Sequence, residues 1–545
     1  MKRSAILLGI SLLTLCGIVQ AEERSLGDVQ VHAGAETQSG PGAAADYDSI
    51  AFTSVITADD LKDRKTDLPE VLEEQAGVAI KRRGGLDDFA TVSIRGSTSE
   101  QVAVYVDGIL LNQGQGGAVN VATIPVDQIE RIEIYKGAAP ARFQSSSIGG
   151  VVNIVTKKAG AGRTTTLGAS YGSFNTISGT ALQAQRFSTT AYQAGYTFTH
   201  SDGDFTFEND HGTPFNTADD TVDKRANNDF NRHNLFTKFE WAPVGAHGHA
   251  PLHISFNNQF FREDRGIPGL GTLTSNTANL STTRDAVSLE FKKREIWKSL
   301  ALSLIPFFQY QKQQFSDPFG EIGLGIQDND DDTFQYGSTL LGEWLWGTHQ
   351  RFTAALDYRG EQFLPEDFSN TPSSGPHSLR NTVSFALEDE IYLANECLVL
   401  NPSIRTEHIF DEQGGAPSTA HHPLSAKLGV KYLPWGAAGW LTIKSNVSRS
   451  FRIPSFSELF GDQGTFVGNP NLKPETSFNW DIGAILVKKP VRWEISYYFN
   501  SVDDLIQLLQ TSQFTIQAQN LSKARIQGVE TAVSADLWNH LNLSA

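Results

Sequence analysis

Most of the chain after residue 160 alternates apolar and polar residues with a period of two. In one such segment Leu252, Ile254 and Phe256 alternate with His253 and Ser255. Similar segments span residues 287–292, 441–448 and 491–500. Successive side chains of a strand point to opposite faces, so this pattern predicts strands with one apolar and one polar face. Long strands of this kind are typical of a transmembrane β-barrel, although a soluble β-sandwich would show the same alternation.

The segment from residue 46 to 158 carries mixed helical and strand signals. Thr57 and Asp67 each have an acid three residues later, which predicts two helix starts, and Gly77 predicts the end of the second helix. The apolar run 102–106 is followed by Asp107-Gly108, a strong hairpin signal. We therefore expect a small α+β domain at 46–158 and a strand-rich domain at 161–545.

The N-terminus has the order of a secretory signal peptide. Lys2 and Arg3 precede an apolar run over residues 5–19, and the small residue Ala21 offers a cleavage site. The run is shorter than the ~20 residues that a membrane-spanning helix needs. We therefore expect a leader at 1–21. Residues 33–45 are rich in Gly, Ala and Ser, which predicts a flexible tether.

Composition narrows the class of protein. The 545 residues are 39% hydrophobic and only 19% charged, with 48 glycines, which fits an all-β protein with many turns. The net charge of −17 argues against a nucleic-acid partner, because phosphates would repel an acidic chain. After the leader, Cys397 is the only cysteine, so neither an internal disulfide nor a His/Cys metal cluster is expected.

Several short motifs, in order and at matching spacing, resemble those of TonB-dependent outer-membrane receptors, the siderophore and cobalamin receptor family. In the first domain they are Ile94-Arg95-Gly96, Val106-Asp107-Gly108, Ile129 to Ile134 and Gly149 to Thr156. In the second domain they are Phe451 to Phe460, Gly468 to Ser477 and Asn520 to Glu530. One departure is Phe143-Gln144, where the family usually has Tyr-Gly. The resemblance runs from about residue 26 to the end of the chain.

The resemblance implies an N-terminal α+β plug domain inside an antiparallel transmembrane β-barrel in the Gram-negative outer membrane, surrounded by its lipid. Such barrels have 22 strands. At about ten residues per strand plus loops, residues 161–545 provide roughly 16 to 18 strands. The chain also stops at Ala545 in what reads as mid-strand. We therefore expect an incomplete barrel whose last strands are missing from this chain.

The segment 22–45 is expected to interact with TonB, which works with the ExbB-ExbD energy-coupling complex. Around Asp28, Val29, Gln30 and Val31 the chain alternates polar and apolar residues and resembles the start of many family members. In the family, an extended segment in this region pairs with a strand of TonB through main-chain hydrogen bonds. A short strand docked on the plug is the alternative interpretation.

Charged plug residues are candidates for a reversible polar lock between plug and barrel. Placed inside a barrel, Arg95, Glu130, Arg131 and Glu133 would face a partly hydrated boundary, where unpaired charges are costly. The alternative is that they form ordinary ion pairs within the plug. Nothing nearby supplies a nucleophile with a positioned base, so we expect no enzyme activity.

Two Gly-rich stretches are expected to form ligand-facing apices of the plug, because glycine lets the backbone approach a ligand closely. The side chains that would meet a ligand are Arg82, Arg83, Asp87, Phe89, Gln113 and Gln115. Arg82 and Arg83 could attract an anionic ligand. Flexible polar turns are the alternative interpretation.

Polar stretches between the predicted strands suggest long extracellular loops, among them Glu208 to Asn234, Asp328 to Asp332 and Gly414 to Pro423. Asp328, Asp330 and Asp332 could supply oxygen ligands to a structural calcium ion, the only cofactor that the sequence suggests. A solvated acidic loop is the alternative.

The implied function is active import of a scarce nutrient without breaking any bond in it. A ferric siderophore is the leading ligand, and cobalamin or another corrinoid is the alternative. Two interpretations of other classes remain open, a passive porin and a secreted β-sandwich adhesin. The adhesin would differ in whether the apolar face of residues 441–451 meets lipid or a protein core.

Overall fold

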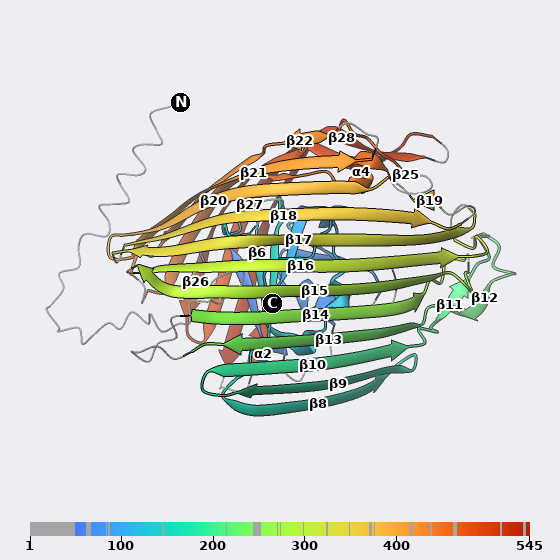
Figure 1. Ribbon diagram of the computed structural model, residues 1–545, viewed down its shortest axis with the longest axis horizontal. Helices are drawn as coiled ribbons and strands as arrows, with labels where there is room; N and C mark the ends of the chain where they lie inside the picture. The colour runs from blue at the N-terminus through green and yellow to red at the C-terminus, as the bar shows by residue number, and fades with distance from the viewer. Residues whose placement is uncertain are drawn as a thin grey trace.

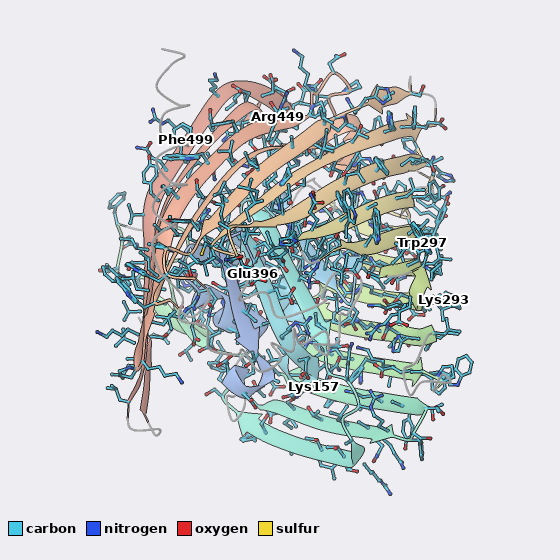
Figure 2. All side chains as sticks on the ribbon, turned by 90° about the vertical axis from the view of Figure 1, so that its left-hand side faces the viewer. Lys157, Lys293, Trp297, Glu396, Arg449 and Phe499 are labelled. Atoms are coloured by element: carbon cyan, nitrogen blue, oxygen red, sulfur yellow. The ribbon has the colours of Figure 1, made fainter. Side chains whose placement is uncertain are left out.

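The computed structural model describes residues 49–544 except for 62–66, 83, 85–87, 144–146, 214, 244–251, 270, 273, 298, 323–324, 348, 370–372, 375, 415–417, 437–438, 462–465, 513–514 and 538–540. The predicted signal peptide at 1–21 and the predicted TonB-interacting segment lie outside these residues. In the described part, a small α+β domain sits inside a large antiparallel barrel (Figures 1 and 2).

The inner domain is built on a five-stranded sheet of order β1-β6-β7-β4-β5 and a separate β2–β3 pair. Its elements are β1 (Thr53–Thr57), α2 (Ala58–Leu61), α3 (Leu68–Glu73), β2 (Val78–Arg82), β3 (Ala90–Ile94), η1 (Ser99–Gln101), β4 (Val102–Val106), β5 (Ile109–Leu110), η2 (Val121–Thr123), η3 (Val126–Gln128), β6 (Ile129–Lys136) and β7 (Gly150–Thr156). We call this domain the plug.

Local sequence signals predicted the plug well. Asp67 caps α3, because its side chain accepts a hydrogen bond from the Glu70 amide, and α3 ends before Gly77. Asp107 and Gly108 both have positive φ and connect β4 to β5, so the predicted hairpin is confirmed. One apolar core joins α3 to both sheets, and Leu72, Ile94 and Ile132 in it are fully buried.

The barrel strands pair antiparallel with their neighbours, except that the short β25 pairs in parallel with β28. They are β8 (Gly162–Gly172), β9 (Thr176–Arg186), β10 (Thr190–Ser201), β13 (Phe230–Trp241), β14 (Leu252–Gly266), β15 (Asn279–Trp297), β16 (Leu300–Asp317), β17 (Gln327–Trp346), β18 (Gln350–Asp367), β19 (Ser373–Ser374), β20 (Ser378–Leu393), β21 (Leu398–Gln413), β22 (Thr419–His421), β23 (Leu424–Tyr432), β24 (Leu441–Arg452), β25 (Phe466–Val467), β26 (Glu475–Lys488), β27 (Val491–Gln510), β28 (Ile516–Leu537) and β29 (Leu541–Ser544).

The strand order is that of a closed barrel in which β29 neighbours β8. That junction differs from the rest, because β29 pairs with β28 over only four residues and most of β8 is exposed on both faces. Twenty described strands make up this order, and β19, β22, β25 and β29 span only two to four residues each. The sixteen that remain agree with the predicted 16 to 18. Whether further strands follow Ala545 stays a prediction.

One loop expectation held in large part and another was wrong. The polar stretch 208–234 runs mostly between the barrel strands β10 and β13, where β11 (Thr206–Asn209) and β12 (Thr221–Lys224) form a hairpin outside the barrel, and only its last residues, from Phe230 on, belong to β13. The acidic run 328–332 lies in β17, paired with β16 and β18. Polar alternation also marks a strand that extends beyond an apolar belt, so polarity alone did not separate strand from loop.

Burial in the barrel wall is inverted relative to a soluble protein. On β20 the apolar side chains Val383, Phe385 and Leu387 point outward and are 42–45% exposed, whereas Thr382 and Ser384 point inward and are buried. On β24, Val447 is exposed while its neighbours Lys444, Asn446 and Ser448 are buried. An exposed apolar belt around a polar interior is what lipid requires of a barrel. This arrangement excludes the soluble β-sandwich adhesin.

The two ends of the barrel differ. Short connections such as 187–189 and 347–349 join strands at one end, and long ones such as 267–278 and 453–474 at the other. Outer-membrane barrels have short periplasmic turns and long extracellular loops, so the long connections lie on the extracellular side. At the short-turn end Trp297, Trp344, Trp346 and Phe352 form a chain of ring contacts, as in an interfacial aromatic girdle. Within the described residues no helix is long and apolar enough to cross a membrane.

Glu321 connects two neighbouring extracellular loops. Its carboxylate accepts hydrogen bonds from the Ser275 hydroxyl at 2.8 Å, the Asn276 amide at 2.8 Å and the Thr277 amide and hydroxyl at 2.9 Å. These bonds, the Ser275 bond first, lower the pKa of Glu321 to about 2. Two loops that are far apart in sequence are therefore held together by one ionised side chain.

Lowering the pH should release this loop contact only in strong acid. Because the pKa of Glu321 is depressed in the folded protein, its contribution is present above the ordinary value of 4.5 and is lost as the pH falls toward 2. We expect Glu321→Gln to accelerate hydrogen exchange at the Asn276 and Thr277 amides at neutral pH. Glu366→Gln, at an exposed site on β18, is the control, and equal exchange in both variants would contradict the assignment.

The lipid-facing assignment of β20 predicts a position-dependent cost for a charge. Phe385→Arg places a cation in the apolar belt and should lower the free energy of unfolding in bilayers by about 2–4 kcal/mol. Phe319→Arg is the matched control, because Phe319 is 74% exposed in an extracellular loop. Urea titration in lipid vesicles measures both variants, and equal destabilisation would argue against a lipid-facing β20.

Candidate functional site

The contact surface between plug and barrel is polar, and in one part of it a buried arginine of the plug forms ion pairs with the barrel. Arg95 follows β3, has a φ of +52° and is 3% exposed. Its guanidinium pairs with Asp481 on β26 at 3.0 Å and with Glu530 on β28 at 2.9 Å. It also lies 5.0 Å from the ring centre of Tyr498. A plug cation is thus held by two barrel carboxylates.

Gly77 makes this arrangement possible. It has a φ of +76°, and its carbonyl oxygen accepts a hydrogen bond of 2.7 Å from the Arg95 amide. A Cβ at this position would overlap the Glu530 carboxylate. The glycine that ends the predicted helix therefore also lets the barrel carboxylate approach the plug backbone.

The other three residues predicted for the lock are placed differently. Arg131 pairs with Glu133 at 2.7 Å, and Glu133 also accepts hydrogen bonds from Tyr135 and Asn153, all within the plug. Glu130, on the other face of β6, is exposed. Residues two apart on a strand share a face, so Arg131 and Glu133 satisfy each other locally and the expectation that they face the barrel was wrong.

Several plug–barrel contacts were not predicted. The Ala141 amide donates to Glu388 at 2.8 Å, and the Ala141 carbonyl accepts from Arg405 at 3.0 Å. Near the start of the described chain, Lys444 donates to the Ser49 carbonyl. Most of these contacts use plug backbone atoms, which leave no residue-type signal in the sequence.

The second predicted apex, residues 112–117, is held by barrel residues on the extracellular side. Gln335 donates to the Asn112 carbonyl at 3.0 Å, and the Gly114 amide donates to Glu361 at 3.1 Å. Gln113 accepts from Gln311 at 3.2 Å.

A short helix from the long connection 453–474 also touches this apex. The helix is α4 (Phe456–Phe460), and the Phe456 amide donates to the Gly114 carbonyl at 2.6 Å. The Ser457 amide donates to the Gln115 carbonyl at 3.2 Å. In the described structure the apex is therefore covered by α4 rather than freely open to solvent.

The first predicted apex is only partly described. Arg82 pairs with Asp67 on the plug at 2.7 Å, and its side chain is 31% exposed. Phe89 is half-buried, and the neighbouring Asp88 pairs with Arg265 of β14 at 3.3 Å. Arg83 and Asp87 lie outside the described residues. The structure thus gives Arg82 a partner within the plug.

A cavity of about 60 Å³ lies between the second apex and the barrel wall. Its walls include Gln113 and Gly114 of the plug, Glu361 of β18 and the three buried arginines Arg359, Arg380 and Arg452. Arg380 is paired with Asp411 at 2.6 Å, and Arg452 with Glu458 and Glu475, both at 2.9 Å. Three cations around one small space beside the plug apex make this the candidate ligand site.

Glu475 links this region back to the plug. It is fully buried, and besides Arg452 it accepts a hydrogen bond of 2.6 Å from Gln101 of η1. Glu458 meanwhile accepts from the Ser455 amide at 2.7 Å and closes the N-terminal cap of α4. The apex, α4, Arg452, Glu475 and Gln101 therefore form one connected polar network.

The calcium hypothesis gains no support from the geometry. Asp330 pairs with Lys312 at 2.8 Å, Asp332 accepts from the Tyr310 hydroxyl at 2.7 Å, and Asp328 lies further along the same strand. In the described part of the chain, no group of three or more His, Cys, Asp or Glu side chains could hold a metal ion. The acidic stretch that was expected in a loop is part of strand β17.

The decisive comparison is with protein-family models. Residues 45–151 match the TonB-dependent receptor plug domain, and residues 138–545 match the TonB-dependent receptor-like β-barrel. The chain belongs to the TonB-dependent receptor family. It is therefore a TonB-dependent outer-membrane transporter, as its motifs predicted. The plug and barrel domains together exclude a passive porin.

Solved structures of similar fold agree. The siderophore receptor PirA from Acinetobacter baumannii has a TM-score of 0.68 and 17% identity, over 89% of this chain and 78% of that chain. The copper transporter OprC has a TM-score of 0.74 and 15% identity, over 93% and 79%. The FrpB iron transporter (F3-3 variant) from Neisseria meningitidis has a TM-score of 0.72 and 14% identity, over 89% and 78%. At these identities the likeness concerns the fold, and the three proteins carry different cargoes.

The Arg95 cluster predicts a specific weakening of plug anchoring. Arg95→Gln leaves Asp481 and Glu530 buried without their cation, which should cost about 3–5 kcal/mol. Protease sensitivity of the plug across a urea titration would show earlier plug release in this variant than in the wild type.

Two further variants make this test specific. Arg82→Gln is the matched control, because its partner Asp67 is on the plug and partly exposed. The triple variant Arg95→Gln, Asp481→Asn, Glu530→Gln removes the unpaired charges and should recover most of the loss. Equal plug release in the Arg82 and Arg95 variants would contradict a plug–barrel role for Arg95.

Proposed function

We propose that this TonB-dependent receptor imports a ferric siderophore across the outer membrane. The observation that carries the proposal is the arginine-lined cavity between the plug apex and the extracellular half of the barrel. Many ferric siderophore complexes are anionic, and arginine is suited to bind carboxylate or catecholate oxygens. The fold relatives that are named as siderophore receptors and iron transporters support the same choice.

Ligand binding would act first on the contacts of the apex. A ligand in the cavity would lie against Gln113 and Gly114 and beside Arg452. Arg452 is bonded to Glu475, which is bonded in turn to Gln101 on the plug. A shift of Arg452 toward a ligand would therefore change the bonding of a plug residue outside the apex loop. Through these bonds, ligand binding in the cavity would change the contacts of the plug.

Energy coupling would act at the other end of the plug. We propose that the segment around Asp28 to Val31 pairs as a strand with TonB, driven by the ExbB-ExbD complex. A pull on this segment would first put the Lys444–Ser49 contact under tension, and then the ion pairs that Arg95 forms with the barrel. Ion pairs break and re-form without covalent change, and water entering the boundary lowers the cost of separating them. Polar plug anchoring therefore suits a reversible transport cycle.

Uptake by cells tests the proposal directly. Cells that express the full-length gene should accumulate a radiolabelled ferric siderophore in the presence of TonB and lose that uptake without it. Cobalamin is assayed in parallel, since TonB-dependent uptake of cobalamin alone would assign the chain to corrinoids. Uptake of any probe that is unchanged by loss of TonB would overturn active transport.

A pair of proline variants tests the TonB-interacting segment. Val29→Pro removes a backbone N–H and should abolish strand pairing and uptake. Ala35→Pro, in the tether, is the matched control and should leave uptake intact. Full uptake in the Val29 variant would exclude this segment as the TonB contact.

A further inference from the structure

A second cavity, of about 50 Å³, lies between the plug loop 137–147 and the inner face of β21, β23 and β24. Four of the residues that the barrel contributes to its wall are serines, namely Ser403, Ser425, Ser448 and Ser450. The Ser425 and Ser448 hydroxyls are buried and have no hydrogen-bond partner among the described residues. Because buried polar atoms are nearly always bonded, these hydroxyls indicate a hydrated space. We call it the serine cavity.

The plug presents mostly small side chains to the serine cavity. Apart from Phe143, its largest stretch there is residues 137–141, which are one glycine, three alanines and one proline. The barrel holds this stretch through its backbone, because the Ala141 amide donates to Glu388 and the Ala141 carbonyl accepts from Arg405. Small side chains interlock little with the wall, so this part of the plug can slide along it.

The inner face of this wall holds its charges in pairs. Arg405 pairs with Asp357 at 2.7 Å and with Glu407 at 2.9 Å, and Lys427 pairs with Glu388 at 3.4 Å. Serine hydroxyls both donate and accept hydrogen bonds, so they can solvate a polar ligand in place of water. A path for a ligand needs weak sites of this kind, because a ligand that is held firmly does not leave.

The serine cavity lies on the same strands as the candidate ligand site. On β24, Arg452 borders the ligand site, whereas Ser450 and Ser448 border the serine cavity. On β21, Ile409 borders the ligand site and Arg405 the serine cavity. Because β24 runs from the short-turn end toward the long connection 453–474, the serine cavity is on the periplasmic side of the ligand site.

The chain segment that leads into the plug covers the same strands still further inward. All three backbone carbonyls of residues 49–51 accept hydrogen bonds from β24, two of them from Lys444 and the middle one from Asn446. A Cβ on Gly429 of β23 would lie only 3.5 Å from the Ile50 Cβ, so the segment also lies against β23. We call residues 49–51 the strap.

Strap, serine cavity and ligand site follow one another along β24. Lys444, Ser448 and Arg452 mark them at intervals of four residues, about 13 Å each at the usual rise of a strand. The strap directly follows the proposed TonB-interacting segment and linker, so a pull on that segment would move the strap first. Ala51 packs in one apolar cluster with Phe143, which borders the serine cavity. Removal of the strap would therefore open this cavity toward the periplasm.

We propose that the transported chelate passes inward along β21, β23 and β24 through the serine cavity, and that the strap is the inner gate of this path. The inference rests on the proposed import function and deepens it, because it states which contacts have to open. Opening starts with the strap and the adjoining stretch 137–141. The side of the plug next to β9 stays against the barrel throughout.

Two cross-links between plug and barrel test the path in cells that express the full-length chain in a Cys397→Ser background. Ile50→Cys with Gly429→Cys ties the strap to β23, since the Cβ separation of 3.5 Å suits a disulfide. Asp127→Cys with Thr180→Cys is the matched control on β9, where the two native side chains are hydrogen-bonded at 2.9 Å. Dibromobimane, a short thiol cross-linker, joins the control pair.

The strap disulfide should abolish TonB-dependent uptake of the radiolabelled ferric siderophore, or of cobalamin if the wild type imports that probe, while binding of the probe to the cells stays unchanged. Reduction with dithiothreitol should restore uptake. The β9 cross-link should leave uptake intact. Loss of uptake with both cross-links would mean that the whole plug has to move, and intact uptake with the strap disulfide would put the path elsewhere. Either result overturns the inference while import stands.

Thiol labelling of the purified full-length chain in detergent tests the gate without any transported ligand. In the Cys397→Ser background, Lys444→Met removes the hydrogen bonds of this cation to the strap. It should raise the rate at which a charged thiol reagent labels Ser448→Cys roughly 10- to 100-fold. Ser288→Cys is the reference, because Ser288 on β15 is 1% exposed, and its labelling rate should not change. Heat-modifiable gel migration checks that each variant is folded.

The two experiments separate the two proposals. Absence of TonB-dependent uptake of every probe by the wild type would overturn the proposed function, and the labelling rates then decide the gate alone. A rise confined to Ser448→Cys supports the gate. Unchanged labelling of Ser448→Cys, or an equal rise at Ser288→Cys, would show that the strap does not close this path.

Discussion

The structure depends on one constraint, which is that lipid offers no hydrogen bonds to a polypeptide backbone. Strands that pair around a barrel satisfy their backbone groups with one another, and the apolar side chains then face outward. Val383 and Phe385 are exposed on β20, while Thr382 and Ser384 are buried. The barrel interior is therefore polar, and any domain inside it must present polar contacts to that interior. The plug meets this requirement with backbone amides, carbonyls and a few buried charges.

Buried charges make the plug firmly held and yet removable. The Arg95 guanidinium is costly to bury alone, so its attraction to Asp481 and Glu530 mainly offsets desolvation. Water would oppose the separation of a hydrophobic interface of the same area, because separation exposes its apolar surface. Hydration of the boundary lowers the cost of separating the charges, whereas hydration of an apolar contact does not. This difference explains how one domain can close the barrel and also be displaced from it.

Sequence predicted what depends on neighbouring residues and missed what depends on distant ones. Period-two alternation identified the barrel strands, and Asp107-Gly108 identified the β4–β5 hairpin. The lock was only partly predicted, because Arg95 reaches the barrel whereas Arg131 pairs with Glu133 two residues away. The cavity could not be predicted, because two of its lining residues that bond to each other, Gly114 and Glu361, are 247 positions apart and no local pattern connects them.

The motif from Phe451 to Phe460 shows how a family signature acquires a physical role. Its arginine, Arg452, forms part of the cavity wall, and its glutamate, Glu458, both pairs with Arg452 and caps α4. The first amides of α4 bind the carbonyls of the plug apex. Binding, loop position and plug contact thus share the same few side chains. A ligand that displaces Arg452 would disturb both the N-terminal cap of α4 and the hydrogen bonds from α4 to the plug apex. Ligand recognition outside the cell and release of the plug would then be linked through the same side chains.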